Sequence, residues 1–121
     1  MAKILVIDDH RELRELFTEV LVGAGHEVIA AADGSLGLAL YARHRPAIVI
    51  TDLEVPAISG LEVIERLRFE PGLQIIAISG SNRENLEIAR DLGAAVTLKK
   101  PFSIRDLTAA VRRLAGDAPP T

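Results

Sequence analysis

Five short, mostly apolar runs constrain the fold of this chain more than any other feature of its sequence. Each run has four or five residues, and a longer segment with apolar residues at helical spacing follows it. Short runs bounded by turn residues are typical of strands buried on both faces, and the longer segments are typical of amphipathic helices. The sequence therefore predicts strands at residues 4–7, 27–31, 47–51, 74–78 and 95–98.

The strict alternation of strand and helix predicts an α/β fold, with a five-stranded parallel sheet and helices on both faces. Crossovers between parallel strands are right-handed, which leaves few arrangements, and the order 2-1-3-4-5 of a flavodoxin-like (βα)5 fold is a common one. In that order the first and third strands are neighbours. Residues at their carboxyl ends therefore meet at one edge of the sheet, although they are far apart in sequence.

Length and composition indicate one domain without disulfides. The chain has 121 residues, a net charge of −3, no cysteine and no apolar run as long as a membrane helix. Basic residues form no stripe, so no nucleic-acid surface is expected, and the short N-terminal run is not typical of a signal peptide. We expect a cytoplasmic domain over residues 1–116, followed by a polar tail or linker start over residues 117–121.

Polar residues stand at the carboxyl ends of four predicted strands. They are Asp8, Asp9, Asp52, Ser79 and Lys100. Three carboxylates brought together repel one another unless a cation neutralises them, and oxygen ligands with open positions suit Mg²⁺. One carboxylate can then attack phosphorus, because a metal ion, an ammonium group and a hydroxyl group are available for the phosphoryl oxygens.

The order and spacing of these residues resemble the receiver domain of two-component response regulators. The resemblance covers nearly the whole chain, from Lys3 to about Leu114. It rests on Asp8-Asp9, Asp52 to Pro56 with Gly60, Ser79, and Lys100-Pro101. Each part is weak alone, but together they form a specific pattern, which implies a signalling module rather than an enzyme.

The resemblance also implies a role for each residue of the pattern. It implies that Asp52 accepts a phosphoryl group from a histidine of a sensor histidine kinase or a histidine phosphotransfer protein. Asp9 and Asp52 would bind Mg²⁺ through their side chains, and Asp8 would act through a water molecule. The backbone carbonyl of Glu54 would be a further protein ligand.

Two more roles follow from the same resemblance. Lys100 would pair with the phosphoryl oxygens, and Ser79 would be the hydroxyl that moves to meet them. The bond between Lys100 and Pro101 resembles one that is cis in the family. The signal would change the face of the fourth helix, fifth strand and fifth helix, where a partner or a second copy could dock as a homodimer.

Three positions depart from the pattern of the family. Val55 stands where Met is common, Gly80 where Ala is common, and Thr97 where an aromatic switch, Tyr or Phe, is frequent. A Thr side chain is too small and too stiff to replace a rotating ring. We therefore expect phosphorylation to move residues 79–85 and the start of the fourth helix, with Gly80 giving that loop backbone freedom.

Four other functions stay open. The domain could pass on or store phosphoryl groups in a phosphorelay. It could be a Mg²⁺-dependent phosphatase with an aspartate nucleophile, although Glu54 stands where such enzymes typically have a second Asp. A nucleotide-binding flavodoxin-like domain is a third hypothesis, but Asp8 and Asp9 stand where phosphate-binding glycines would be. The fourth is a degenerate receiver that binds partners without phosphorylation.

Features beside the site have simpler interpretations. Asp9 and Glu12 resemble a capping box at the start of the first helix. The position of His10 next to two acids suggests a metal ligand, but we interpret it as a surface residue of the first helical turn near the site, because the metal ion already has oxygen ligands. The fourth helix is predicted from about Asn82 to Leu92.

Overall fold

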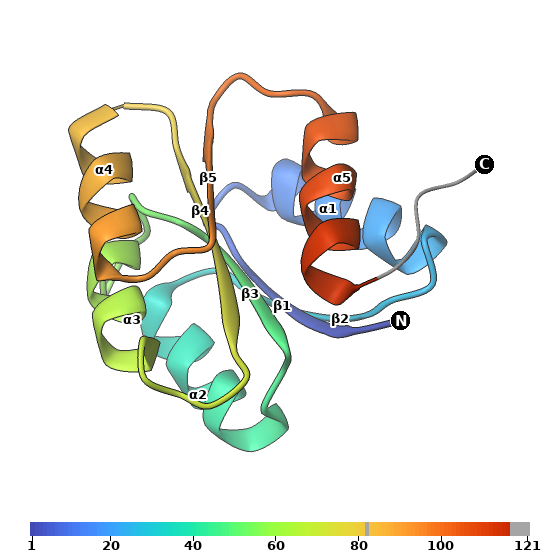
Figure 1. Ribbon diagram of the computed structural model, residues 1–121, viewed down its shortest axis with the longest axis horizontal. Helices are drawn as coiled ribbons and strands as arrows, with labels where there is room; N and C mark the ends of the chain where they lie inside the picture. The colour runs from blue at the N-terminus through green and yellow to red at the C-terminus, as the bar shows by residue number, and fades with distance from the viewer. Residues whose placement is uncertain (82, 117–121) are drawn as a thin grey trace.

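The computed structural model describes residues 1–81 and 83–116 of the chain. Strands and helices alternate along it, as Figure 1 shows. The strands are β1 (Lys3–Ile7), β2 (Glu27–Ala31), β3 (Ile48–Asp52), β4 (Gln74–Ser79) and β5 (Val96–Lys99). The helices are α1 (Arg11–Gly23), α2 (Gly34–His44), α3 (Gly60–Leu67), α4 (Arg83–Leu92) and α5 (Ile104–Ala115).

The strands form one parallel sheet in the order β2-β1-β3-β4-β5. Helices α1 and α5 cover one face, and α2, α3 and α4 cover the other (Figure 1). This arrangement confirms the α/β fold and the strand order expected from the sequence. The register pairs Ile7 of β1 with Thr51 of β3, and Asp52 with Ile78 of β4, so the carboxyl ends of these strands lie level.

Alternating side chains of the central strands fill two apolar layers. Val49 and Ala77 belong to the layer beneath α2, α3 and α4, whereas Ile50 and Ile76 belong to the layer beneath α1 and α5. A strand that turns successive side chains to opposite faces needs apolar residues at every position when both faces are covered. This requirement explains the unbroken apolar runs of the sequence.

The helix starts agree with the sequence in part. Ser103 and Asp106 form a capping box at α5, and the Asp33 side chain accepts a hydrogen bond from an N–H group in the first turn of α2. The capping box predicted from Asp9 and Glu12 is wrong. His10, not Asp9, is the N-cap residue of α1, and its side chain makes no cap bond. The Asp9 carboxylate lies near the His10 ring instead.

Several smaller predictions concern the ends of elements. The bond between Lys100 and Pro101 is cis, as the resemblance implied. Helix α4 begins at Arg83, and the predicted start at Asn82 lies outside the described residues, as does the predicted tail over residues 117–121. Among the helices of the described ranges, none is long and apolar enough to cross a membrane.

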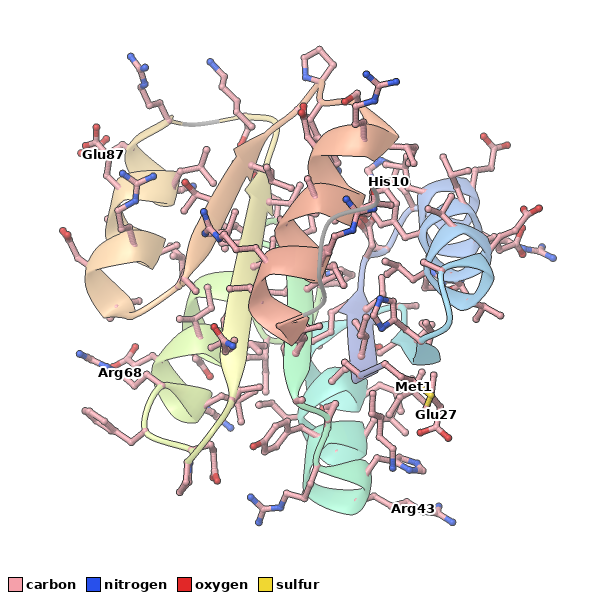
Figure 2. The ribbon with its side chains drawn as sticks, turned by 45° about the vertical axis from the view of Figure 1, so that its right-hand side comes forward. Met1, His10, Glu27, Arg43, Arg68 and Glu87 are labelled. Atoms are coloured by element: carbon pink, nitrogen blue, oxygen red, sulfur yellow. The ribbon has the colours of Figure 1, made fainter. Side chains whose placement is uncertain are left out.

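Figure 2 shows where the functional edge lies in the molecule. His10 is at the end where the parallel strands finish, and Met1 and Arg43 are at the opposite end. The polar residues picked out from the sequence come from this strand-end edge. The fold therefore brings together residues that are more than 40 positions apart, such as Asp8 and Asp52, as the strand order predicted.

Candidate phosphoacceptor and metal site

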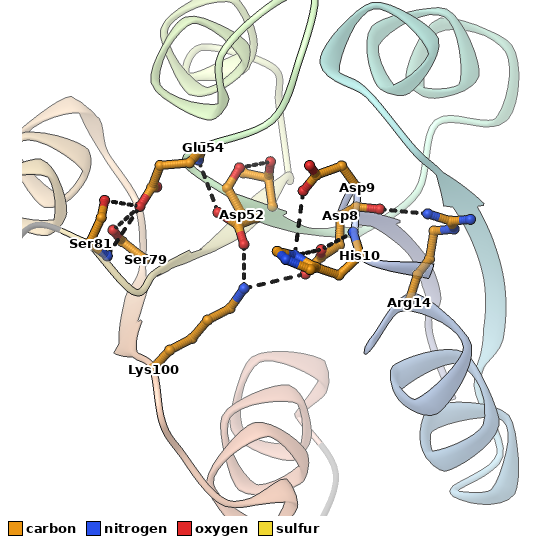
Figure 3. A network of polar contacts seen from close by, with 10 residues as sticks. Asp8, Asp9, His10, Arg14, Asp52, Glu54, Ser79, Ser81 and Lys100 are labelled. Carbon is orange, nitrogen blue, oxygen red and sulfur yellow. Dashed lines mark hydrogen bonds and ion pairs between the residues drawn. The ribbon is translucent and has the colours of Figure 1, made fainter. Parts of the chain in front are cut away.

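Three charged side chains meet where β1, β3 and β5 end (Figure 3). Asp52 is the last residue of β3, and Asp8 and Lys100 directly follow β1 and β5. The Nζ atom of Lys100 lies 2.5 Å from Oδ2 of Asp52 and 3.8 Å from Oδ2 of Asp8. Both aspartates are buried, with exposed fractions of 1% for Asp8 and 4% for Asp52.

The electrostatic balance at Asp52 favours its neutral form more than in water. Burial raises the pKa of Asp52 above its ordinary value, and the hydrogen bonds from Lys100 and from the Glu54 N–H only partly offset this effect. Burial lowers the pKa of Lys100, but its hydrogen bond and charge attraction to Asp52 outweigh burial and raise that pKa. One cation is therefore shared between two buried carboxyl groups, and a second cation would balance the negative charge that remains.

Asp8 has one oxygen in use and one without a hydrogen bond. Its Oδ1 accepts a hydrogen bond from the His10 N–H at 2.8 Å, and its backbone carbonyl accepts one from Arg14. Its Oδ2 is buried and has no hydrogen-bond partner among the described residues. Buried acceptors are nearly always satisfied, so this oxygen is available to a bound ligand.

Asp9 and His10 lie beside this acidic cluster. Asp9 is exposed, and its Oδ1 lies 3.5 Å from Nδ1 of His10, which is also 3.4 Å from Oδ1 of Asp8. Ligand atoms of Asp8, His10 and Asp52 all lie within 4.8 Å of one another. His10 is exposed, as expected for a surface residue of the first helical turn, and its ring also lies close to the carboxylates of Asp8 and Asp9.

Carboxylate oxygens, one of them buried and without a hydrogen bond, are a donor set that suits a divalent cation such as Mg²⁺. The Asp52 Oδ1 atom accepts a hydrogen bond from the Glu54 N–H, which holds the β3–α3 turn close to Asp52. Gly60 permits this turn to close, because a Cβ atom at this position would lie 2.3 Å from the carbonyl oxygen of Asp52.

Ser79 lies on the β4 side of the site and faces Glu54. Its Oγ donates to Oε1 of Glu54 at 2.6 Å, and Oγ of Ser81 donates to the same oxygen. Burial raises the pKa of Glu54, but these two hydroxyl groups outweigh burial and lower that pKa below its ordinary value. The roles of the Glu54 carboxylate and of Ser81 were missed in the sequence, where only their spacing from Asp52 and Ser79 could have indicated them.

Thr97 borders a groove on the outer side of β5. Its Oγ1 accepts a hydrogen bond from Nη2 of Arg90 at 2.8 Å. The groove has a volume of about 320 Å³ and lies between α4 and β5. Its lining residues are Arg83, Leu86, Glu87, Arg90, Thr97 and Lys99. The position that often holds an aromatic ring in the family therefore holds a small side chain bonded to α4.

The comparisons with known proteins agree with this fold and site. The family model of the response regulator receiver domain matches residues 4–112. The chain is 28% identical over 113 residues to sporulation initiation phosphotransferase F of Bacillus subtilis, covering 92% of this chain and 91% of that protein. The crystal structure of a response regulator receiver domain protein from Clostridium thermocellum is similar with a TM-score of 0.89 and 29% identity, covering 96% and 95%.

A longer relative is the probable transcriptional regulator ycf27 of Porphyridium aerugineum, which is 37% identical over 111 residues. The match covers 91% of this chain but 46% of that protein, so the chain spans about half the length of this curated relative. The protein described here belongs to the response regulator receiver domain family. Members of this family are phosphoacceptor modules of two-component signalling.

Proposed function

We propose that this domain accepts a phosphoryl group on Asp52 in a Mg²⁺-dependent reaction and signals through the face formed by α4, β5 and α5. The observation that carries the proposal is the buried contact between Asp52 and Lys100, beside an Asp8 oxygen that lacks a hydrogen bond. A purely structural ion pair needs neither a second buried carboxylate nor an unsatisfied oxygen.

In the proposed reaction a carboxylate oxygen of Asp52 attacks phosphorus, and the bond from phosphorus to a histidine nitrogen of the donor breaks. The leaving nitrogen keeps the electron pair of that bond. Lys100 already contacts Asp52, so its ammonium group can follow the negative charge onto the phosphoryl oxygens. Bound Mg²⁺ would supply charge neutralisation for the same oxygens.

The metal ligands are proposed as Asp9 and Asp52 through their side chains, Asp8 through water, and Glu54 through its backbone carbonyl. Support comes from the acidic cluster at the ends of β1 and β3 and from the turn that holds Glu54 above it. Asp9 is exposed beside the acidic cluster and pairs only with the exposed His10 ring, so its side chain can reorient towards an ion.

Ser79 is proposed as the hydroxyl that responds to phosphorylation. It is held by Glu54, so a move towards a phosphoryl group on Asp52 requires this hydrogen bond to break. The same change releases one of the two hydroxyl groups that hold the Glu54 carboxylate, and it alters the loop between β4 and α4. Helix α4 and β5 border the groove at Thr97, and they form the proposed output face with α5.

The phosphoryl donor is proposed to be a sensor histidine kinase or a histidine phosphotransfer protein, and the location to be the cytoplasm. We also propose residues 1–116 as the receiver domain and residues 117–121 as a tail or linker. A homodimer through the output face is one proposed result of phosphorylation. A role in passing on or storing phosphoryl groups is the second candidate, supported by the similarity to a protein named sporulation initiation phosphotransferase F.

Mass spectrometry after incubation with a small-molecule phosphodonor and Mg²⁺ tests the proposal. We expect one acid-stable, base-labile phosphoryl group on Asp52, no label on the Asp52→Asn variant, and no label with a chelator present. Asp91→Asn changes an exposed aspartate of α4 and serves as the matched control, which should be labelled like the wild type. Labelling that survives Asp52→Asn would refute the assignment of the acceptor.

A further inference from the structure

The groove between α4 and β5 carries more positive than negative charge. Its volume is about 320 Å³, and three of its described lining residues are cationic: Arg83, Arg90 and Lys99. Glu87 is the acidic residue among them. All four charged residues are exposed, so their charged groups are accessible from solvent. A concave surface with this excess of positive charge favours an anionic ligand.

The cations of this groove lack acidic partners. Within the described ranges, neither Arg83 nor Lys99 makes an ion pair, although Glu87 follows Arg83 by one helical turn. Nη2 of Arg90 donates a hydrogen bond to Oγ1 of Thr97 at 2.8 Å, and this acceptor is neutral. An arginine and a carboxylate can instead form two parallel hydrogen bonds between opposite charges. Arg90 therefore gains when a carboxylate replaces the hydroxyl group.

We propose that this groove binds a carboxylate side chain of an acidic segment in a protein partner, and that Arg90 exchanges Thr97 for this carboxylate. The inference rests on the proposed function in one respect, because α4 and β5 belong to the proposed output face. Charge complementarity favours the acidic segment. A nucleic acid is disfavoured, because basic residues form no stripe along the chain beyond the groove.

The exchange would couple partner binding to the position of α4. The hydrogen bond from Arg90 to Thr97 joins α4 to β5. A carboxylate that takes the guanidinium group of Arg90 removes this connection, so α4 can shift relative to β5. Because coupling between two sites is reciprocal, a phosphorylation-linked change that breaks the same hydrogen bond would strengthen binding of the acidic segment.

The rival explanation is that Arg90 only fastens α4 to β5. Two substitutions separate the explanations. Arg90→Gln removes the guanidinium group, whereas Thr97→Val removes the competing acceptor and leaves that group free. If Arg90 recognises a carboxylate, only Arg90→Gln weakens binding of an acidic segment. If it only fastens α4, both variants loosen the same contact and affect binding alike.

Arg43→Gln is the matched control for Arg90→Gln, because it makes the same change of charge on another helix. Arg43 is exposed in the last turn of α2. Figure 2 shows it on the opposite side of the molecule from Glu87, which lines the groove. Any effect that Arg90→Gln shares with this control comes from net charge rather than from the groove.

The experiment is a fluorescence anisotropy titration of the unphosphorylated protein with a labelled peptide rich in Glu, and with the same peptide carrying Gln at every Glu. We expect only the acidic peptide to bind, and added salt to weaken it, because salt screens exposed charges. Arg90→Gln should weaken binding about fivefold or more, as the loss of a hydrogen bond between charged groups implies. Thr97→Val should leave binding unchanged or strengthen it up to about threefold. Arg43→Gln should change it less than about twofold.

Amide spectra of the same titration locate the peptide, which should shift the amides of Arg90, Thr97 and Lys99 and leave α2 unchanged. Equal binding by the wild type and Arg90→Gln, weaker binding by Thr97→Val, or tighter binding of a short single-stranded DNA through Arg90 would overturn the inference. A domain that is labelled on Asp52 but does not bind the peptide would refute the inference alone. Peptide binding through Arg90 by a domain that takes no phosphoryl group would support the inference and refute the proposed function.

Discussion

The central strand β3 and the edge strand β5 carry different halves of the site, and they differ most in burial. All residues of β3 are buried, and β1 and β4 pair with it on its two sides. In β5, Val96 to Leu98 are half-buried and Lys99 is exposed, and only β4 pairs with it. Asp52, the proposed acceptor, ends β3, and Thr97 lies in β5.

This difference separates the proposed place of the chemistry from the proposed place of its response. Asp52 is held by the sheet on both sides, so its position and its raised pKa are set by surroundings that cannot relax. The Thr97 side chain accepts one hydrogen bond from Arg90 beside a groove open to solvent, and its backbone pairs with β4 alone. A weakly held edge can rearrange at low cost, whereas a buried centre cannot.

The largest expected difference in stability is between an alanine substitution at Gly60, beside β3, and one at Gly80, after β4. A Cβ atom at Gly60 would lie 2.3 Å from the carbonyl oxygen of Asp52, which belongs to the backbone and cannot yield. At Gly80 the nearest atoms are 3.4 Å away, in the side chain of Lys100. Urea unfolding should show that Gly60→Ala costs about 2–3 kcal/mol, and that Gly80→Ala costs within about 0.5 kcal/mol.

Labelling of Asp52 by a phosphodonor is a second readout for this pair of variants. Gly60→Ala should also slow labelling by a phosphodonor, because it displaces the turn that follows the acceptor. Gly80 has no positive φ, so its substitution tests whether the expected backbone freedom of the β4–α4 loop matters. Equal costs at the two positions would remove the distinction between centre and edge.

The next largest effect concerns the pH dependence of folding stability, to which two carboxyl groups contribute in opposite directions. Folding raises the pKa of Asp52, so the folded state binds the Asp52 proton more tightly than the unfolded chain does. The stability that this proton contributes is therefore lost as the pH rises above 3.8. The folded state lowers the pKa of Glu54, so the stability from Glu54 is present above pH 4.5 and is lost as the pH falls.

Thermal unfolding of two variants in chelator checks these signs. Asp52→Asn should raise the unfolding midpoint at pH 7 by a few degrees, about what 1 kcal/mol gives a domain of this length. Glu54→Gln should lower the midpoint at pH 7, and its difference from the wild type should shrink towards pH 4. A lower midpoint for Asp52→Asn would mean that its pairing with Lys100 outweighs burial.

The smallest expected effect comes from replacing a threonine by valine on β3 and, separately, on β5. Thr51→Val on β3 removes a buried hydroxyl that donates to the Asp52 carbonyl at 2.9 Å, and it should cost about 1 kcal/mol. Thr97→Val on β5 removes the acceptor of an exposed Arg90, which water can replace, and it should cost less than about 0.5 kcal/mol. Urea unfolding of the two variants measures the difference, and a larger cost at Thr97 would contradict the account.

The sequence was sufficient for the sheet and for the meeting of Asp8 and Asp52. Both follow from long-range rules: apolar runs buried on two faces, right-handed crossovers, and one edge for all carboxyl ends. It also predicted that Lys100 would lie at this edge, where the structure places its ammonium group between the two aspartates.

Side-chain directions were not predictable in the same way. Asp9 has the spacing of a cap residue, but its carboxylate turns to His10. Ser79 was expected to respond to a phosphoryl group, and in this structure it bonds to Glu54, a partner 25 positions away. Choices among nearby hydrogen-bond partners depend on loop geometry, which residue spacing does not determine.

Amide chemical shifts with and without beryllium fluoride and Mg²⁺ test most directly whether phosphorylation at the end of β3 changes the structure of α4 and the edge strand β5. The account predicts shifts around Asp52 and Lys100 together with a continuous set over residues 79–97, including Thr97 and the start of α4. The Asp52→Asn variant should show neither set. Shifts confined to the immediate surroundings of Asp52, with residues 80–97 unchanged, would contradict the account and favour a domain that stores or passes on phosphoryl groups.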